Sequence, residues 1–179
     1  MSVLAYVELS DQRLAGRLQS WRPPRWLRVW MLTASRLGDG WLWLGAPLLL
    51  ALETSRGPSF IGAAALAAAV ANTLVVVLKR RFRRRRPAAH SPNPFFALAR
   101  PELLDFDHFS FPSGHSLNAF AVCSILALAF PPLALGYALL AASVGASRVV
   151  LRLHFLSDVL AGALIGVLIG VSSVLLVVG

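Results

Sequence analysis

The residues from 147 to 158 carry charged and reactive side chains between two apolar runs of the sequence. His154 and Asp158 are four residues apart, so they would share one face of a helix. A carboxylate beside an imidazole fixes its tautomer and stabilises its cationic form, which is the usual arrangement of an activated histidine. Arg148 adds a permanent positive charge to the same stretch. Because charged residues at the edge of a hydrocarbon region are costly, this stretch predicts a functional site.

Two other polar stretches carry groups that suit a phosphate anion. Lys79 and Arg86 are seven residues apart, about two helical turns, so they share a face if one helix continues through both. Ser113 offers a hydroxyl and Gly114 a backbone N–H at the predicted start of a helix, which is a natural anion site. His115 follows directly as a second imidazole. Two histidines at one anion site suggest one nucleophile and one proton donor.

The composition predicts an integral membrane protein. Of the 179 residues, 57% are hydrophobic, and the mean hydropathy is +0.68, which is too apolar for an ordinary soluble domain. The net charge of +9 lies in short gaps between apolar runs, which favours anionic lipid surfaces and phosphate over nucleic acid. The single cysteine excludes an internal disulfide, and residues 1–20 lack the continuous apolar core of a cleavable signal peptide.

The apolar pattern predicts an all-α, polytopic membrane helical bundle. Five segments are expected to cross the membrane: residues 37–55, 59–78, 114–130, 133–150 and 159–178. Residues 1–36 predict amphipathic helices that lie in the headgroup region, with a sixth, tilted span as the alternative. Residues 37–179 would then form the membrane-embedded domain. Gly162, Gly166 and Gly170 repeat every four residues, which predicts close packing against another helix.

The order of the spans predicts that the three polar stretches meet. The span that ends before Lys79 and the span that begins after Ser113 place both residues on one side of the membrane. The next two spans cross and return, which brings Arg148, His154 and Asp158 to that side. Each segment crosses once because a backbone surrounded by lipid must be helical throughout. We therefore expect two imidazoles and three fixed cations in one pocket.

Taken together, the three stretches resemble the three-part signature of the type 2 phosphatidic acid phosphatase superfamily. That family includes membrane lipid phosphate phosphatases and shares its helical core with vanadium-dependent haloperoxidases. The matching residues are Lys79-x6-Arg86-Pro87, Pro112-Ser113-Gly114-His115 and Ser147-Arg148-x5-His154-x3-Asp158. All three parts are complete and in order. The resemblance covers about residues 79–158, and the first 36 residues lie outside it.

The resemblance implies a metal-independent phosphatase that uses no cofactor. His154 would attack phosphorus and form a phosphohistidine, and Asp158 would orient His154. His115 would protonate the leaving oxygen and then activate water. The groups that would hold the phosphate oxygens are Lys79, Arg86, Arg148, Ser113 and the amide of Gly114.

The predicted function is hydrolysis of a phosphomonoester or pyrophosphate carried by a lipid. Candidate substrates are undecaprenyl pyrophosphate or another polyprenyl phosphate, phosphatidylglycerophosphate, phosphatidic acid and lipid A phosphate, because the motifs hold the phosphate and do not select the tail. One alternative is a lipid phosphotransferase that passes the phosphoryl group from His154 to a second lipid. The other is a non-catalytic lipid-binding membrane protein. The expected partners are a lipid phosphate and membrane lipids, with no nucleic acid and no prediction of oligomeric state.

The remaining arginines of the basic tract are interpreted as an interfacial face near anionic headgroups, where each contributes roughly 1 kcal/mol. They are Arg80, Arg81, Arg83, Arg84 and Arg85.

Of the 17 Lys and Arg residues, all except Arg56 fall on the predicted active-site side. The positive-inside rule places that side in the cytoplasm, beneath what we expect to be a bacterial cytoplasmic membrane. Many bacterial relatives of the resembling family are thought to act on the outer face, so both orientations stay open.

Overall fold

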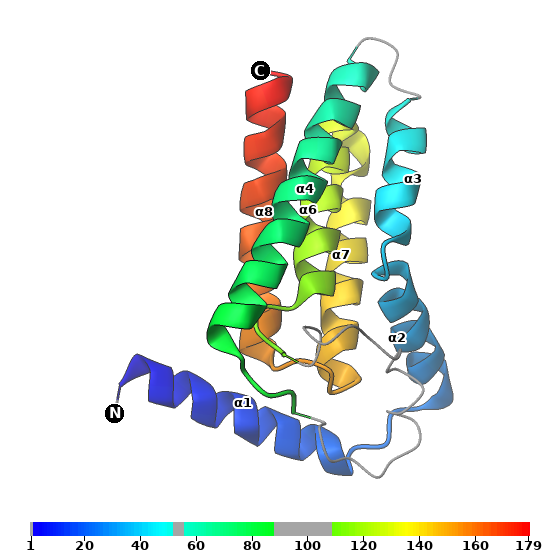
Figure 1. The fold of residues 1–179 in the computed structure, drawn as a ribbon. Helices are drawn as coiled ribbons and strands as arrows, with labels where there is room; N and C mark the ends of the chain where they lie inside the picture. The colour runs from blue at the N-terminus through cyan, green and yellow to red at the C-terminus, as the bar shows by residue number, and fades with distance from the viewer. Residues whose placement is uncertain (1, 52–55, 88–108) are drawn as a thin grey trace.

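The structure, a computed structural model, describes residues 2–51, 56–87 and 109–179. These residues form seven α-helices and one short 3-10 helix, and they contain no β-strand apart from an isolated bridge. The helices are α1 (Val3–Ser20), α2 (Arg25–Leu37), α3 (Trp41–Leu50), α4 (Gly57–Phe82), α6 (Gly114–Ala129), η2 (Pro131–Leu133), α7 (Ala134–Val150) and α8 (Leu156–Val177). The prediction of an all-α bundle is confirmed (Figure 1).

Three helical segments are long and apolar enough to cross a membrane. They are Gly57–Phe82, Pro131–Val150 and Leu156–Val177. The fourth helix of the bundle, α6, is apolar but has only 16 residues. The chain is therefore an integral membrane protein with three candidate spans and one shorter apolar helix among the residues described.

The first predicted span is interrupted. We expected one helix to begin at residue 37, but α2 ends at Leu37 and α3 begins at Trp41. The break falls where two glycines flank Asp39, and Gly40 has a φ of +103°, a value that side chains disfavour. α2 and α3 follow one another along the side of the bundle (Figure 1). The last residues of the predicted span, 52–55, lie outside the described part of the chain.

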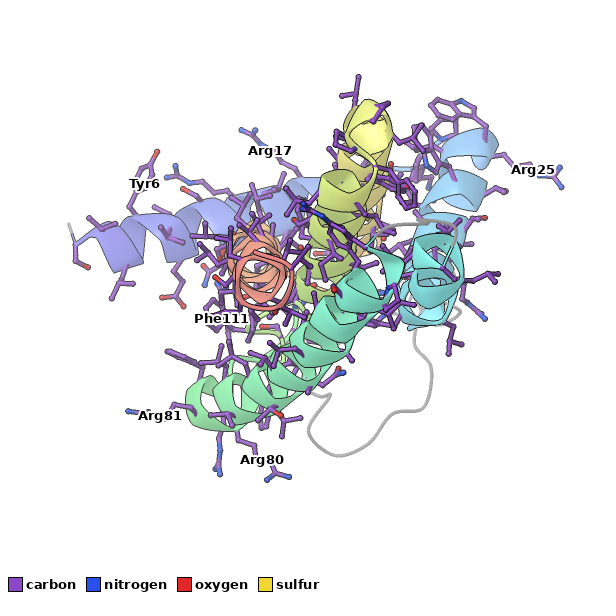
Figure 2. The ribbon with its side chains drawn as sticks, turned by 90° about the horizontal axis from the view of Figure 1, so that it is seen from above. Tyr6, Arg17, Arg25, Arg80, Arg81 and Phe111 are labelled. Carbon is purple, nitrogen blue, oxygen red and sulfur yellow. The ribbon has the colours of Figure 1, made fainter. Side chains whose placement is uncertain are left out.

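The two N-terminal helices differ in orientation. α1 lies across the lower end of the bundle and projects beyond it (Figures 1 and 2). α2 was expected in the same layer, with a tilted span as the alternative, and its depth relative to the headgroups stays a prediction. It packs against α7, and Met31 lies in a buried cluster with Leu151 and Leu153. This apolar contact explains the upright position of α2.

The centre of the bundle is the contact between α6 and α8. A Cβ added to Gly162 would lie 2.6 Å from the Ser113 carbonyl oxygen, and one added to Gly170 would lie 2.5 Å from that of Ala121. A Cβ on Gly166 would overlap the carbonyl oxygen of Leu117. The glycine stripe therefore allows the two backbones to touch, as its spacing predicted. This contact places the start of α6 beside the start of α8.

Replacing Gly166 with alanine should lower the stability of the protein by about 1–3 kcal/mol, because the added methyl group meets backbone that has no room to move. Thermal unfolding in detergent measures the effect. Gly136→Ala in α7 is the matched control, since nothing lies within 4 Å of its added Cβ. Equal melting temperatures for the two variants would contradict the close α6–α8 contact.

Candidate active site

The basic tract, residues 79–86, begins in the last turn of α4 and continues beyond the end of that helix. α4 ends at Phe82, and Arg83 has a left-handed φ of 49° with its N–H donating to the carbonyl of Lys79 at 3.0 Å. The chain then runs extended, and the N–H of Ser110 donates to the carbonyl of Arg84 at 2.8 Å. Lys79 and Arg86 therefore do not share a helix face, which corrects that prediction. Arg86 reaches the site by the extended route instead.

His154 lies in the tight turn between α7 and α8. The N–H groups of Leu153 and His154 both donate to the carbonyl of Arg148, at 2.9 and 3.1 Å. α8 begins only at Leu156, so His154 precedes the helix, and the prediction of a shared helical face with Asp158 is wrong. The side chain of Arg86 donates to the Leu153 carbonyl at 3.3 Å, which fixes this cation beside the same turn.

The protonation pattern of His154 follows from its contacts. Its Nδ1 lies 2.7 Å from the carbonyl oxygen of Ser110. A carbonyl only accepts, so Nδ1 carries the proton and Nε2 keeps its lone pair. The nearer oxygen of Asp158 is 3.9 Å from Nδ1, too far for a hydrogen bond. The family resemblance implied that Asp158 orients His154, and nothing in the sequence pointed to the Ser110 carbonyl, because a backbone atom leaves no signal in a motif.

Asp158 caps the start of α8. Its Oδ2 accepts the N–H of Phe155 at 2.9 Å, and its Oδ1 pairs with the Arg84 guanidinium at 2.6 Å. The carboxylate is fully buried and stays close enough to His154 to stabilise positive charge on the imidazole. Arg84 was interpreted as a headgroup-facing residue, and the structure places it inside the site instead.

The second histidine belongs to the start of α6. Ser113 is the N-cap of this helix, as predicted, and its hydroxyl accepts the N–H of Ser116 at 3.4 Å. Gly114 is the first helical residue, one of the positions whose N–H lacks a partner within the helix. The N–H of Ser113 donates to the Asp158 carbonyl at 3.1 Å. The groups predicted to hold phosphate at this helix start therefore lie against the start of α8.

His115 pairs with a residue that was not among the predicted site residues. Its Nε2 lies 2.6 Å from Oδ1 of Asp39, in the break between α2 and α3. Burial raises the pKa of Asp39, but the hydrogen bond and charge of His115 and the charges of Arg148 and Arg36 outweigh it, so the pKa is lowered. The sequence signal of Asp39 was a charged residue between two glycines near the end of a predicted span, and that signal does not identify a histidine partner.

The predicted cations gather around His154. Lys79 and Arg148 are both only 3% exposed, and Arg148 donates to the hydroxyl of Ser35 in α2 at 2.5 Å. The pKa of His154 is lowered well below 6.5, first by burial and then by four positive neighbours. These neighbours are Arg86, Arg148, Lys79 and His115. The structure therefore brings together the two imidazoles and the three fixed cations that the sequence placed on one side.

Replacing Arg86 with glutamine should move the acid limb of the activity profile to higher pH. Cationic neighbours keep His154 neutral below the pH at which an ordinary histidine gains a proton, so losing one of them raises the pKa of His154. The measurement is kcat/KM against pH for the variant and the wild type. Arg80→Gln, which removes an exposed cation from the end of α4, is the control. An acid limb that does not move would show that Arg86 has no influence on the His154 charge.

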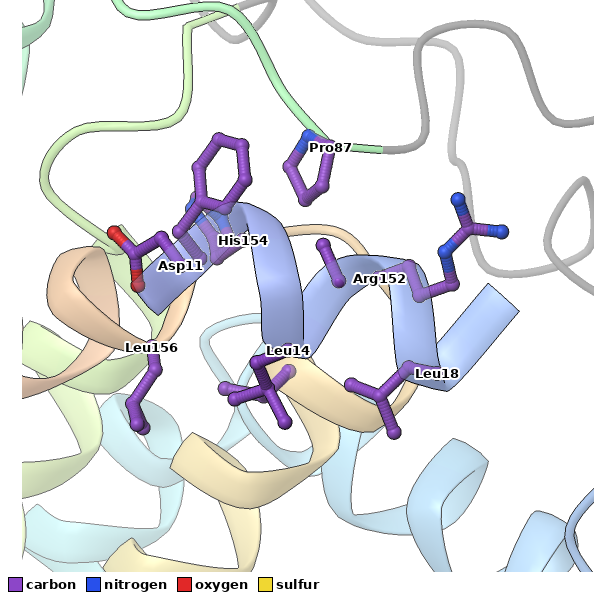
Figure 3. Close-up of a pocket in the computed structure, with 10 residues that line it drawn as sticks. Asp11, Leu14, Leu18, Pro87, Arg152, His154 and Leu156 are labelled. Atoms are coloured by element: carbon purple, nitrogen blue, oxygen red, sulfur yellow. The ribbon is translucent and has the colours of Figure 1, made fainter. Parts of the chain in front are cut away.

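A small, open cleft lies beside His154 between α1 and the α7–α8 turn (Figure 3). Asp11, Arg152 and His154 contribute its polar lining. Its apolar lining comes from Leu14, Ala15, Leu18, Pro87, Val149, Phe155 and Leu156. Within the part of the chain that the structure describes, no three His, Cys, Asp or Glu side chains group as metal ligands do. The cleft thus joins a polar site to a hydrocarbon-lined wall.

The chain is similar in sequence and overall fold to known proteins. Residues 60–178 match the PAP2 superfamily. A solved PAP2-type phosphatidylglycerolphosphate phosphatase from Bacillus subtilis is 27% identical, with a TM-score of 0.69, and the match covers 94% of this chain and 84% of that one. LpxE from Aquifex aeolicus is 28% identical, with a TM-score of 0.72, and the match covers 90% of this chain and 93% of that one.

Proposed function

Because the chain belongs to the PAP2 superfamily and resembles a membrane lipid phosphatase over most of its length, we propose that it hydrolyses a phosphate ester or anhydride of a lipid through a phosphohistidine. The observation that carries this proposal is the state of His154. Its Nε2 keeps a free lone pair because Nδ1 is bound to the Ser110 carbonyl, and it is surrounded by cations that suit a phosphate dianion.

The proposed reaction has two steps. In the first, the Nε2 lone pair of His154 attacks phosphorus, the bond from phosphorus to the lipid oxygen breaks, and His115 protonates that oxygen. In the second, His115 takes a proton from water, the water oxygen attacks phosphorus, and the P–N bond breaks to return His154. Lys79, Arg86 and Arg148 stabilise the charge on the phosphate oxygens. No step requires a metal ion.

Asp39 supports the second histidine in this scheme. A carboxylate 2.6 Å from Nε2 of His115 stabilises the protonated imidazole, which is the form that donates to the leaving oxygen. Asp158 serves His154 at longer range. It lies 3.9 Å from Nδ1 and offsets the positive charge that forms on the ring when Nε2 bonds to phosphorus.

The cleft supports a lipid as the substrate. His154 lines it, and Leu14, Ala15 and Leu18 of α1 contribute apolar lining. This arrangement suits a molecule that carries a phosphate at one end and hydrocarbon beside it. Phosphatidylglycerophosphate is the first candidate to test, since a solved relative is named for that activity.

A phosphate-release assay on the purified protein tests the proposal. The panel contains phosphatidylglycerophosphate, phosphatidic acid, undecaprenyl pyrophosphate and lipid A phosphate. We expect steady release of phosphate from at least one lipid, in the presence of a chelator, and inhibition by vanadate, which mimics five-coordinate phosphorus. A phosphotransferase would instead move the phosphoryl group to an added acceptor lipid and release little phosphate. Complete loss of activity with chelator would contradict the metal-independent reaction.

We also propose that the active-site end faces the cytoplasm, because the positive charge gathers there. Arg17, Arg80 and Arg81 lie on the elements at this end, whereas Arg56 precedes α4 at the other (Figures 1 and 2). A Ser2→Cys variant tests the orientation, since the native Cys123 is buried. A membrane-impermeant maleimide should label it only after the cells are permeabilised. Labelling in intact cells would reverse the assignment.

A further inference from the structure

A buried carboxylate ties the N-terminal helix to the active site. Asp11 is the one residue of α1 that is fully buried, although the helix lies across the end of the bundle and most of its side chains are exposed. A carboxylate inside a protein needs compensating donors or a cation. Asp11 has both, and they come from two elements of the catalytic region.

Arg84 links the two buried carboxylates. Its Nη2 pairs with Oδ2 of Asp11 at 2.8 Å, and its Nη1 pairs with Oδ1 of Asp158 at 2.6 Å. The guanidinium also lies over the ring of Phe155, 4.3 Å from its centre. One planar cation therefore bridges α1 and α8 in a fixed geometry.

Ser157 completes the connection. Its N–H donates to Oδ1 of Asp11 at 3.1 Å, and its hydroxyl also donates to the Asp11 carboxylate. Nη1 of Arg84 donates to the Ser157 hydroxyl at 2.7 Å. Ser157 is adjacent to Asp158 at the start of α8, so Asp11 acts as an acceptor at the same helix end that carries the catalytic carboxylate.

We infer that Asp11 and Arg84 are positioning residues for the proposed phosphohistidine reaction, and that they hold Asp158 where it serves His154. The inference rests on the proposed function. Arg84 occupies Oδ1 of Asp158, so Oδ2 is the oxygen that stays on the Phe155 N–H and faces His154. Asp11 in turn fixes the direction of the Arg84 guanidinium.

Neither residue is marked by a motif. Arg84 lies among five arginines that look alike in sequence, and Asp11 is 147 residues from Asp158, in a segment outside the family signature. Their role follows only from the contacts that α1 makes when it docks below the bundle (Figure 1). The catalytic carboxylate is thereby connected to a helix that is expected to rest on the lipid surface.

Steady-state kinetics on four variants test the inference. Asp11→Asn and Arg84→Gln should each lower kcat by about 10- to 100-fold, the range typical of residues that orient a reacting group, with KM changed less than threefold or so. Arg84→Lys should recover part of the loss. The matched controls are Glu8→Gln, an exposed carboxylate one turn before Asp11 in α1, and Arg81→Gln, an exposed arginine at the end of α4. Both controls should retain wild-type kcat.

The double variant shows whether Asp11 acts through Arg84 or whether the two residues affect kcat independently. If Asp11 acts through Arg84, the Asp11→Asn/Arg84→Gln protein should be no slower than Arg84→Gln alone. Rates are expressed per mole of folded, monodisperse protein, so that loss of folded protein does not count as loss of kcat. Wild-type kcat in both single variants would overturn the inference, as would losses that multiply in the double variant.

A stability cycle on the same proteins uses no substrate. Thermal unfolding of the two single variants and the double variant should be non-additive if Asp11 and Arg84 are in contact. Additive effects would overturn the inference on structural grounds. If the wild type released no phosphate from any lipid, the proposed function would fail, while this cycle would still decide whether the link exists.

Discussion

His154→Ala should abolish phosphate release from every lipid that the wild type hydrolyses, lowering kcat by about 10,000-fold or more, as loss of a covalent nucleophile does in other enzymes. The physical reason is that His154 presents the lone pair of Nε2 among the positive neighbours that suit a phosphate. The variant should also fail to take up label from a lipid carrying radioactive phosphate. The wild type quenched during turnover should carry an acid-labile, alkali-stable label.

His115→Ala is the matched control for the labelling experiment, because it leaves the nucleophile in place. It should still take up label, although slowly. Phosphate release by His154→Ala at a rate near that of the wild type would mean that the histidine is a buried structural residue. The phosphohistidine assignment would then be wrong.

His115→Ala has the second largest expected effect, a loss of about 100- to 10,000-fold in kcat with little change in KM. Its imidazole has to protonate the leaving lipid oxygen and later activate water, and both demands arise in the transition state rather than on binding. The expected loss is therefore in turnover. Asp39→Asn should show a smaller loss of the same kind, since it weakens the partner of His115 without removing the acid.

An aryl phosphate distinguishes the two roles of His115. A phenolate leaves without protonation, so the first step should recover in His115→Ala while the second, which needs activated water, stays slow. The phosphoenzyme should therefore accumulate with this substrate. Equal impairment on lipid and aryl substrates, with no accumulation, would show that His115 does not act as the leaving-group acid.

The convergence of the site was predictable because it depends on span order alone. Lys79, Ser113 and Arg148 each lie at the end of an apolar segment, and a lipid-embedded backbone has to cross as a helix. The glycine stripe of α8 was predictable for a related reason, since spacing of four residues defines one helical face. Both inferences use only local periodicity and the membrane.

The incorrect predictions concern turns and helix ends, which local sequence periodicity does not determine. Arg83 has a left-handed backbone conformation that ends the helix, so the chain is extended when it reaches Arg86. Sequence periodicity does not predict this conformation. His154 lies in a turn whose shape is set by two N–H groups on the Arg148 carbonyl. The upright position of α2 reflects apolar packing against the α7–α8 turn, and its break near Gly40 separates it from α3.

Residue types and their order along the chain thus established the bundle, the end at which the chemistry gathers, and the two histidines with their three cations. The folded arrangement alone decided which atoms touch: the Ser110 carbonyl on His154, Asp39 on His115, and Asp11 through Arg84 on Asp158. The physical reason is the distance along the chain over which each kind of interaction acts. Hydropathy and helical period act over neighbouring residues, whereas each of these contacts joins segments at least 44 residues apart and depends on distances of a few ångströms that packing sets.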